Sequence, residues 1–268
     1  MHAMLTDRAV ISLSGDDARE FLQGLISNDV RKLEDGQMIY AALLSPQGKF
    51  LHDFFVLLRG GVFYLDVDAS RAADLLQRLN IYKLRSKVSI NLENKLRVAA
   101  SWGGGGNGIS DPRLPQLGYR IIGEVLAEGA DDYERHRLEL GIPDGAKDML
   151  FDKSLLLEFG FEDLHGVDFN KGCYVGQEVT ARSKHRGQVR KFIYQVHANA
   201  ALPPAGTPIF LGDAESGQMR SSRGNIGLAI LRVMDVDAAQ KSNKEFHSGN
   251  VMLKASLPQW VIHKPSPE

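Results

Sequence analysis

The spacing of apolar residues predicts a mixed α+β structure for the first hundred residues. Apolar positions recur at helical spacing after Ser14, which can cap a helix whose first turn carries Asp17. A second helix is expected after Asp68. Short apolar runs bounded by turn residues are typical of strands joined by hairpins. They lie at 39–44, 50–58, 62–67, 87–92 and 95–100. Together these elements indicate an α+β unit.

Beyond residue 100 the pattern changes twice. The glycine-rich run 103–108 predicts a flexible loop at a domain boundary, followed by a strand at 119–122 and a helix over 131–140. From Lys191 onward, short strand candidates separated by turns predict a small all-β barrel or sandwich. These candidates are 192–197, 207–211, 226–231, 251–255 and 260–263. We therefore expect three domains: an N-terminal α+β domain (1–100), a middle α+β domain (101–187) and a C-terminal β-barrel domain (188–268).

Composition and charge exclude some classes of protein. The net charge of −1 over 268 residues argues against a nucleic-acid binder that relies on overall charge. No apolar run is long enough to suggest a membrane span, and residues 1–8 lack the apolar core of a signal peptide. The chain has one cysteine, which fits a reducing compartment, so a cytoplasmic protein is expected.

That cysteine, Cys173, carries the strongest chemical signal. A lone cysteine cannot form an intramolecular disulfide or a multi-cysteine metal site. It can act as a nucleophile, as one ligand shared with another molecule, or as a small buried apolar residue. Lys171 and the glycines at 172 and 176 surround it with a cation and accessible backbone, and this setting favours a thiolate. The histidines show no zinc-site spacing.

Three further features could bind or act on a ligand. Asp53 lies in an otherwise apolar strand, where it is a buried carboxylate if it faces inward and an ordinary edge charge if it faces outward. Arg113 and Arg120, near Tyr119, could pair with a carboxylate, stack on a flat heteroaromatic ring, or pair within their own loop.

The third feature follows the cysteine. Glu178 and Arg182 are four residues apart, which would place them on one face of a short helix. The basic stretch 182–191 is either a solvated charged face or an anion site for a polyglutamyl tail, an RNA backbone or an acidic protein.

The segment Lys-Gly-Cys-Tyr-Val-Gly-Gln-Glu at 171–178 resembles the signature of the YgfZ folate-binding family, which includes iron–sulfur cluster assembly factors related to the glycine-cleavage T-protein. Further segments resemble this family, so the resemblance covers nearly the whole chain. They are 21–30, 45–54, and 111–114 with 118–120.

The resemblance implies a T-protein-like fold of three domains around a central folate-binding cavity, the last domain being a β-barrel. It implies a tetrahydrofolate-binding accessory factor for the assembly or maintenance of iron–sulfur proteins, especially [4Fe–4S] proteins. Partners would be iron–sulfur assembly or client proteins, among them a radical tRNA-modifying enzyme or tRNA itself, with no membrane role. Cys173 would be the functional thiol and a shared iron–sulfur ligand. The other implied site residues are Asp53, Lys171, Gly172, Tyr174, Gln177, Glu178, Arg113, Tyr119 and Arg120.

The chain departs from the pattern at two places. Segment 155–160 lacks the expected Pro-Leu-Glu-Ala-Asn sequence, and Arg120 stands where the T-protein has a pterin-binding glutamate. Loss of that carboxylate removes an acceptor for the donor groups of the pterin, which argues against aminomethyl transfer. A folate-dependent aminomethyl- or methyltransferase that uses Asp53 remains the alternative, and an RNA-binding module that uses the basic stretch is a third reading.

Overall fold

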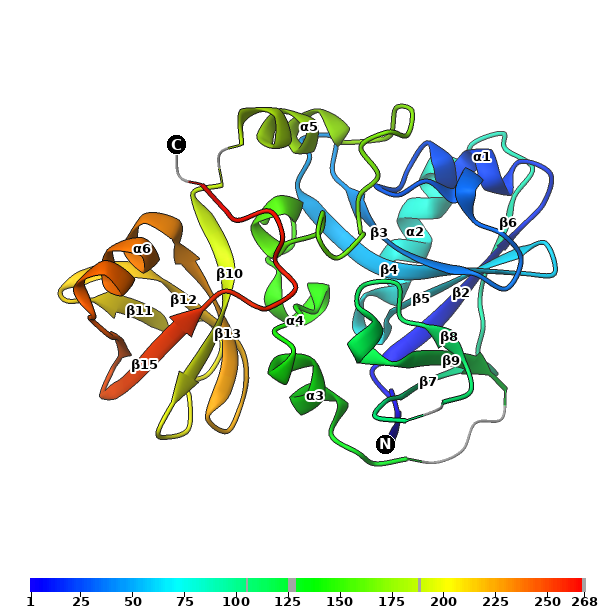
Figure 1. Cartoon of the computed structure of the whole chain (residues 1–268). Coiled ribbons are helices and arrows are strands. Elements are labelled where there is room, and N and C mark those ends of the chain that lie inside the picture. Colours follow the sequence, from blue (N-terminus) through cyan, green and yellow to red (C-terminus); the bar gives the residue numbers. More distant parts are fainter. Residues whose placement is uncertain (105, 125–128, 188, 267–268) are drawn as a thin grey trace. The chain divides into compact units, whose positions relative to one another are not determined.

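The computed structural model describes residues 1–104, 106–124, 129–187 and 189–266 (Figure 1). Gly105 of the expected glycine loop and Gln188 of the basic stretch, which is also the first residue of the expected third domain, lie outside the described residues. Contacts divide the chain into two units, each assembled from separate segments. Unit 1 consists of Met1–Tyr133, Phe151–Lys153 and Leu164–Glu178, and unit 2 of Glu134–Leu150, Ser154–Asp163 and Val179–Glu268. The division into three domains stays a prediction.

Unit 1 contains a five-stranded antiparallel sheet in the order β3-β4-β5-β2-β6. Its strands are β2 (Arg8–Ser14), β3 (Met38–Leu44), β4 (Phe50–Arg59), β5 (Val62–Asp68) and β6 (Ser89–Leu92). The helices of this part of the chain are α1 (Ala18–Gln23), η1 (Val30–Lys32), η2 (Ala69–Arg71) and α2 (Ala72–Lys83). The β3–β4–β5 meander confirms the strand prediction for 39–67.

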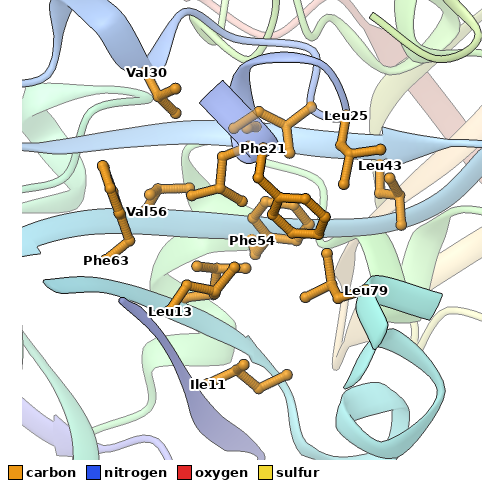
Figure 2. Close-up of a cluster of buried hydrophobic side chains, with 14 of the residues drawn as sticks. Ile11, Leu13, Phe21, Leu25, Val30, Leu43, Phe54, Val56, Phe63 and Leu79 are labelled. Carbon is orange, nitrogen blue, oxygen red and sulfur yellow. The ribbon is translucent and has the colours of Figure 1, made fainter. Parts of the chain in front are cut away.

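One face of this sheet forms the hydrophobic core of unit 1. Phe54, Val56 and Leu79 belong to it, and Figure 2 shows them with neighbouring side chains from β2, β3, β5 and α1. Because side chains alternate along a strand, Asp53 and Phe55 of β4 point to the opposite face. That opposite face is also buried, but it contains charged residues.

A second sheet in unit 1 has the order β1-β7-β9-β8. Its strands are β1 (His2–Met4), β7 (Arg97–Ser101), β8 (Ile109–Ser110) and β9 (Tyr119–Gly123), with the short helix η3 (Pro115–Leu117) before β9. Gly118 begins the turn into β9 with φ +85°, and a Cβ there would lie 2.1 Å from the carbonyl oxygen of Ser101. Glycine is therefore required for the close approach that places Tyr119 and Arg120 on β9.

Unit 2 contains a closed barrel in the order β10-β13-β12-β11-β14-β15 (Figure 1, yellow to red). Its strands are β10 (Lys191–Ala198), β11 (Pro208–Leu211), β12 (Ala214–Arg223), β13 (Ile226–Arg232), β14 (Phe246–Ser248) and β15 (Val251–Ser256). The remaining helices are α3 (Tyr133–Glu139), α4 (Gly145–Asp148), η4 (Leu156–Phe159), α5 (Gln177–Arg186) and α6 (Val233–Ser242). The barrel, together with the mixed helices and strands of unit 1, confirms the predicted fold class.

Some predicted elements are wrong in detail. Ser14 does not cap a helix, because it is the last residue of β2 and pairs with Ser89 of β6. Residues 260–263 form no strand, and the Trp260 side chain is buried, with its indole N–H donating to the carbonyl of Gly141 at 3.3 Å. Within the described residues, no helix is long and apolar enough to cross a membrane.

Candidate functional site

Cys173 is exposed, in a loop that Lys171 fastens to the rest of unit 1. The Lys171 ammonium donates to the carbonyl oxygens of Gln23, Ile26 and Asn28 at 2.8, 2.6 and 2.8 Å. Gln23 ends α1, where unsatisfied carbonyls and the helix dipole favour a cation. An ammonium has three N–H donors, so all three of Lys171 are used in holding the loop.

Lys171 keeps its charge under physiological conditions. Burial lowers its pKa to about 8, while the nearby carboxylates of Asp29 and Asp168 act in the opposite direction. Asp168 is itself paired with Lys32. At neutral pH the ammonium therefore remains the main form, and its three hydrogen bonds anchor the loop. Binding of a ligand by Lys171 stays a prediction.

The other side of Cys173 is fixed by close backbone packing. Gly176 has φ +79°, and a Cβ there would lie 2.4 Å from the carbonyl oxygen of Ser45 in the β3–β4 turn. The N–H of Val175 donates to the carbonyl of Gly24 at 3.1 Å. At Gly172, by contrast, a Cβ would meet nothing within 4 Å. The loop is thus held before and after Cys173, and the thiol is presented to solvent between the two attachments.

The rest of the signature leads into α5. The Tyr174 N–H donates to the side-chain oxygen of Gln177 at 3.2 Å, and the Tyr174 ring lies 5.0 Å from the Lys171 ammonium. Glu178 lies in the first turn of α5, and Arg182 follows on the same helix, as predicted. The site residues of the signature therefore form one continuous segment around the thiol.

A second group of predicted residues lies on the opposite face of the five-stranded sheet. The fully buried Asp66 carboxylate accepts from Arg8 Nε at 2.6 Å and from Arg120 Nε and Nη2 at 2.9 and 2.5 Å. Arg113 binds Asp111 in a bidentate pair at 3.0 and 2.9 Å. Arg113 is therefore paired within its own loop, which was one of the predicted alternatives.

These pairs are locked in their charged forms. Burial alone would raise the pKa of Asp66, but the guanidinium groups of Arg120 and Arg8 outweigh it and lower this pKa. Burial opposes the charge of Arg113, but Asp111 raises its pKa. The Phe55 ring completes the cluster, with the guanidinium carbons of Arg120 and Arg113 at 3.9 and 4.7 Å from its centroid.

Asp53 lies on the same sheet face and is 7% exposed. It accepts a hydrogen bond from the Tyr40 hydroxyl at 2.9 Å, which selects the inward-facing alternative. Its neighbour His52 points to the other face, where Nε2 lies 2.7 Å from Asp74. Burial lowers the pKa of His52 to about 4, so this histidine is neutral at physiological pH.

Sequence reasoning missed several members of the buried cluster, namely Arg8, Tyr40, Asp66 and Asp111. The available signal for Asp66 was a carboxylate inside an apolar strand, since buried acids require partners. Tyr119 was predicted as a site residue; it lies at the start of β9, half-buried, and pairs with Ser101 in the β7–β9 register.

The basic stretch belongs to unit 2 and is partly paired. Lys184 forms an ion pair with Glu162. Arg186 and Arg190 border a cavity of about 270 Å³ whose other walls include Leu155, Leu156 and Val179. Neither the ion pair nor the cavity shows whether the basic stretch binds an anion, so the anion site stays a prediction.

Comparison with known proteins shows which family the chain resembles. The family model described as "GCVT N-terminal domain" matches residues 5–100, and the one described as "CAF17, C-terminal beta-barrel domain" matches residues 176–262. The iron–sulfur cluster assembly factor IBA57, mitochondrial, of Homo sapiens is 31% identical over 306 residues, covering 96% of this chain and 84% of the relative. The chain belongs to the IBA57 family of iron–sulfur cluster assembly factors.

Two fungal members of the IBA57 family are longer than this chain. The homologues from Neurospora crassa and Mycosarcoma maydis are 34% and 35% identical, over 70% and 77% of this chain. The chain covers 52% and 58% of their respective lengths. The glycine cleavage system aminomethyltransferase T from Bartonella henselae has the same fold, with a TM-score of 0.75, 16% sequence identity, and coverage of 98% of this chain and 87% of that chain.

IBA57 family membership confirms the sequence resemblance at the level of the wider family and corrects the predicted location. The relatives named above are mitochondrial proteins, so the expectation of a cytoplasmic protein, drawn from the lone cysteine and the N-terminal residues, is wrong. A low cysteine count does not distinguish between reducing compartments.

The residues present can be tested against tetrahydrofolate, which the resemblance implies. A pterin presents N–H donors and needs a buried acceptor. Arg120 cannot supply one and is committed to Asp66, but the buried Asp53 carboxylate can. The residues present therefore fit a pterin, with the Asp53 carboxylate as the acceptor for its N–H groups. Among the described residues, no group of three or more His, Cys, Asp or Glu side chains could hold a metal ion. Cys173, the one cysteine of the sequence, offers a single sulfur ligand.

Proposed function

We propose that this chain is an accessory factor in the assembly or maintenance of iron–sulfur proteins, especially [4Fe–4S] proteins, and that it works in the mitochondrion. The observation that carries the proposal is the exposed Cys173, held between the Lys171 anchor and the tight contact at Gly176. A thiol that must meet a cluster on another protein needs both exposure and a fixed position. The family relationship supports iron–sulfur assembly and client proteins as the partners.

Cys173 acts in this proposal as one ligand of a shared cluster. Iron–sulfur clusters are usually held by four cysteine thiolates. The chain has only one cysteine, so a partner protein or a small thiol supplies the remaining ligands. The cluster is cargo that passes across Cys173 and is not a resident cofactor of this chain.

Tetrahydrofolate is the proposed small-molecule ligand. Support comes from the T-protein-like fold and from Asp53, a buried carboxylate held by the Tyr40 hydroxyl. When bound, the folate would supply a reduced pterin that can carry one-carbon groups. Aminomethyl transfer is the less favoured function, because Arg120 replaces the expected carboxylate and is already paired with Asp66.

Complementation in cells that lack this protein tests the iron–sulfur role. The chain is directed to mitochondria as wild type, Cys173→Ala or Lys153→Met, and the activities of a [4Fe–4S] enzyme and a radical tRNA-modifying enzyme are measured. We expect Cys173→Ala to fail. Lys153→Met is the control and should rescue, because Lys153 is an exposed residue outside the signature loop. Equal rescue by both variants, at equal protein levels, would remove Cys173 from the mechanism.

A further inference from the structure

Helix α5 turns one of its faces toward a cavity of unit 2. The residues that it contributes to the lining are Val179, Thr180, Arg182, Ser183 and Arg186. Residues three and four apart are neighbours on the surface of a helix, so this spacing describes a single face. The cavity is therefore built on an ordered helix, and all the residues that line it belong to unit 2.

The wall opposite this helix face is apolar. It consists of Leu155, Leu156 and Leu157, at the start of η4, and Val189 lines the cavity as well. Leu156 and Leu157 are buried, so this wall is part of the packed interior of unit 2. The cavity has a volume of about 270 Å³. A cavity of about 150 Å³ can hold a benzene ring, so this one has room for a large apolar side chain.

Positive charge surrounds this apolar space. Arg182, Arg186 and Arg190 line the cavity and are exposed. Among the described residues of the lining, Glu158 is the only acid, so the lining carries a net charge of +2. Arg182 and Arg186 are four residues apart on α5, a spacing at which like charges repel each other. An acidic partner would relieve this repulsion.

Two of the three arginines are available to such a partner. Within the part of the chain that the structure describes, neither Arg186 nor Arg190 takes part in an ion pair. Lys184 of the same helix is different, because it is paired with Glu162 and does not line this cavity. The free cations of α5 and of the segment after it are thus those beside the apolar space.

The lining fits a segment of a protein better than a nucleic acid. Single-stranded RNA is usually bound by stacking its bases on aromatic side chains, and no described residue of the lining is aromatic. A phosphate backbone would leave the leucine wall without a function. An apolar pocket surrounded by arginines is instead typical of the centre of a protein–protein interface.

We propose that this cavity is a docking site for an acidic segment of a partner protein. One large apolar side chain of the segment enters the cavity, and carboxylates beside it pair with Arg186 and Arg190. A guanidinium group offers two parallel N–H donors that match the two oxygens of a carboxylate. Burial of the apolar side chain supplies most of the affinity, whereas the exposed ion pairs select acidic segments and speed association. The inference does not depend on the iron–sulfur role of Cys173.

The test uses the purified full chain and three blocked peptides. The first peptide is Glu-Glu-Phe-Glu-Glu, the second has alanine in place of phenylalanine, and the third has glutamine in place of every glutamate. Titrations followed by NMR chemical shifts measure weak binding and show which residues are affected. The variants are Arg186→Gln, Arg190→Gln, both together, and Val179→Phe, which fills the cavity without changing its charge. Arg232→Gln is the matched control, since Arg232 is an exposed arginine that does not line the cavity.

Wild type should bind the first peptide with shifts at α5 and 155–158. Loss of the phenyl ring should weaken binding by about 10-fold or more. Arg186→Gln and Arg190→Gln should each weaken it by about 2- to 5-fold, and the double variant by about 4- to 25-fold. The glutamine peptide should bind wild type and the double variant equally. Val179→Phe should abolish the preference for phenylalanine over alanine, and Arg232→Gln should bind like wild type.

Three results would overturn the inference. The first is that wild type binds none of the peptides, or binds them with shifts elsewhere. The second is that the double variant binds the acidic peptide as tightly as Arg232→Gln does. The third is that a uridine 12-mer binds more tightly than the acidic peptide and loses affinity in the double variant, which would make the arginines an RNA site. Thermal unfolding of each variant confirms that it is folded, and the peptide series on wild type does not depend on any variant.

Discussion

Replacing Lys171 with methionine should loosen the loop that presents Cys173. The variant keeps the length of the aliphatic stem but removes the ammonium that donates to the carbonyls of Gln23, Ile26 and Asn28. Hydrogen bonds to a charged group contribute about 1.5 kcal/mol each at the low end, or about 4.5 kcal/mol for three. The low end is appropriate because water can reach part of this site.

The cost of burying the ammonium must be subtracted. The pKa of Lys171 falls from 10.5 to about 8. This difference corresponds to about 3 kcal/mol against the charged form, reduced to about 2 kcal/mol because the side chain is partly exposed. The net contribution of Lys171 to the free energy of unfolding is therefore about 2 to 3 kcal/mol, and Lys171→Met should lose that amount.

Urea unfolding of wild type and variant measures this loss, and amide hydrogen exchange over residues 170–177 measures where it acts. Lys153→Met is the matched control: it removes an exposed lysine of unit 1 and should change stability by less than about 0.5 kcal/mol. If Lys171→Met behaves like Lys153→Met, or if exchange in the loop is unchanged, the anchoring role assigned to Lys171 is incorrect.

Two further predictions concern buried ionisable groups of unit 1. The pKa of His52 is about 4 in the folded protein and about 6.5 in the unfolded chain, so the unfolded state binds more protons between these values. From pH 7 to pH 4.5 the free energy of unfolding should fall by about 2 to 3 kcal/mol on account of His52. Urea titrations at both pH values should show a smaller fall in His52→Gln; an equal fall would assign the effect to other groups. Asp66→Asn leaves Arg8 and Arg120 buried without a full counter-charge and should cost about 3 to 5 kcal/mol in denaturant unfolding. The exposed Asp213→Asn is its control, and similar stability of these two variants would show that the buried cluster is not a stabilising ion network.

Local patterns predicted the parts of the fold whose hydrogen bonds join neighbours in sequence. The β3–β4–β5 meander follows from apolar runs separated by short turns, and the structure pairs them in that order. Strand β12 was missed because Ala214–Arg223 is mostly polar, and only its partners in the barrel make it a strand. Segment 260–263 looked like a strand, but burial of Trp260 explains its apolar character.

In the candidate site, too, local sequence patterns identified only the features formed by residues close together in sequence. The signature loop was found because its residues are contiguous. Pairing of Arg113 within its own loop was one of the predicted alternatives, and its partner Asp111 lies only two residues away. The carbonyl partners of Lys171 are more than 140 residues away in sequence, and the partner of Arg120 is 54 residues away. No local pattern identifies such contacts, so the anchoring role of Lys171 emerged only from the structure.

The two units are interleaved along the chain, and this has a consequence for how the protein is made. Unit 1 includes Leu164–Glu178, whereas unit 2 already begins at Glu134. No single cut separates the units, and a growing chain that has completed the large sheet still lacks the segment that carries Cys173. The thiol loop is synthesised only after two segments of unit 2, Glu134–Leu150 and Ser154–Asp163. Cys173 therefore reaches its anchored position late, when the end of α1 and the residues after it, whose carbonyls receive Lys171, have already been synthesised.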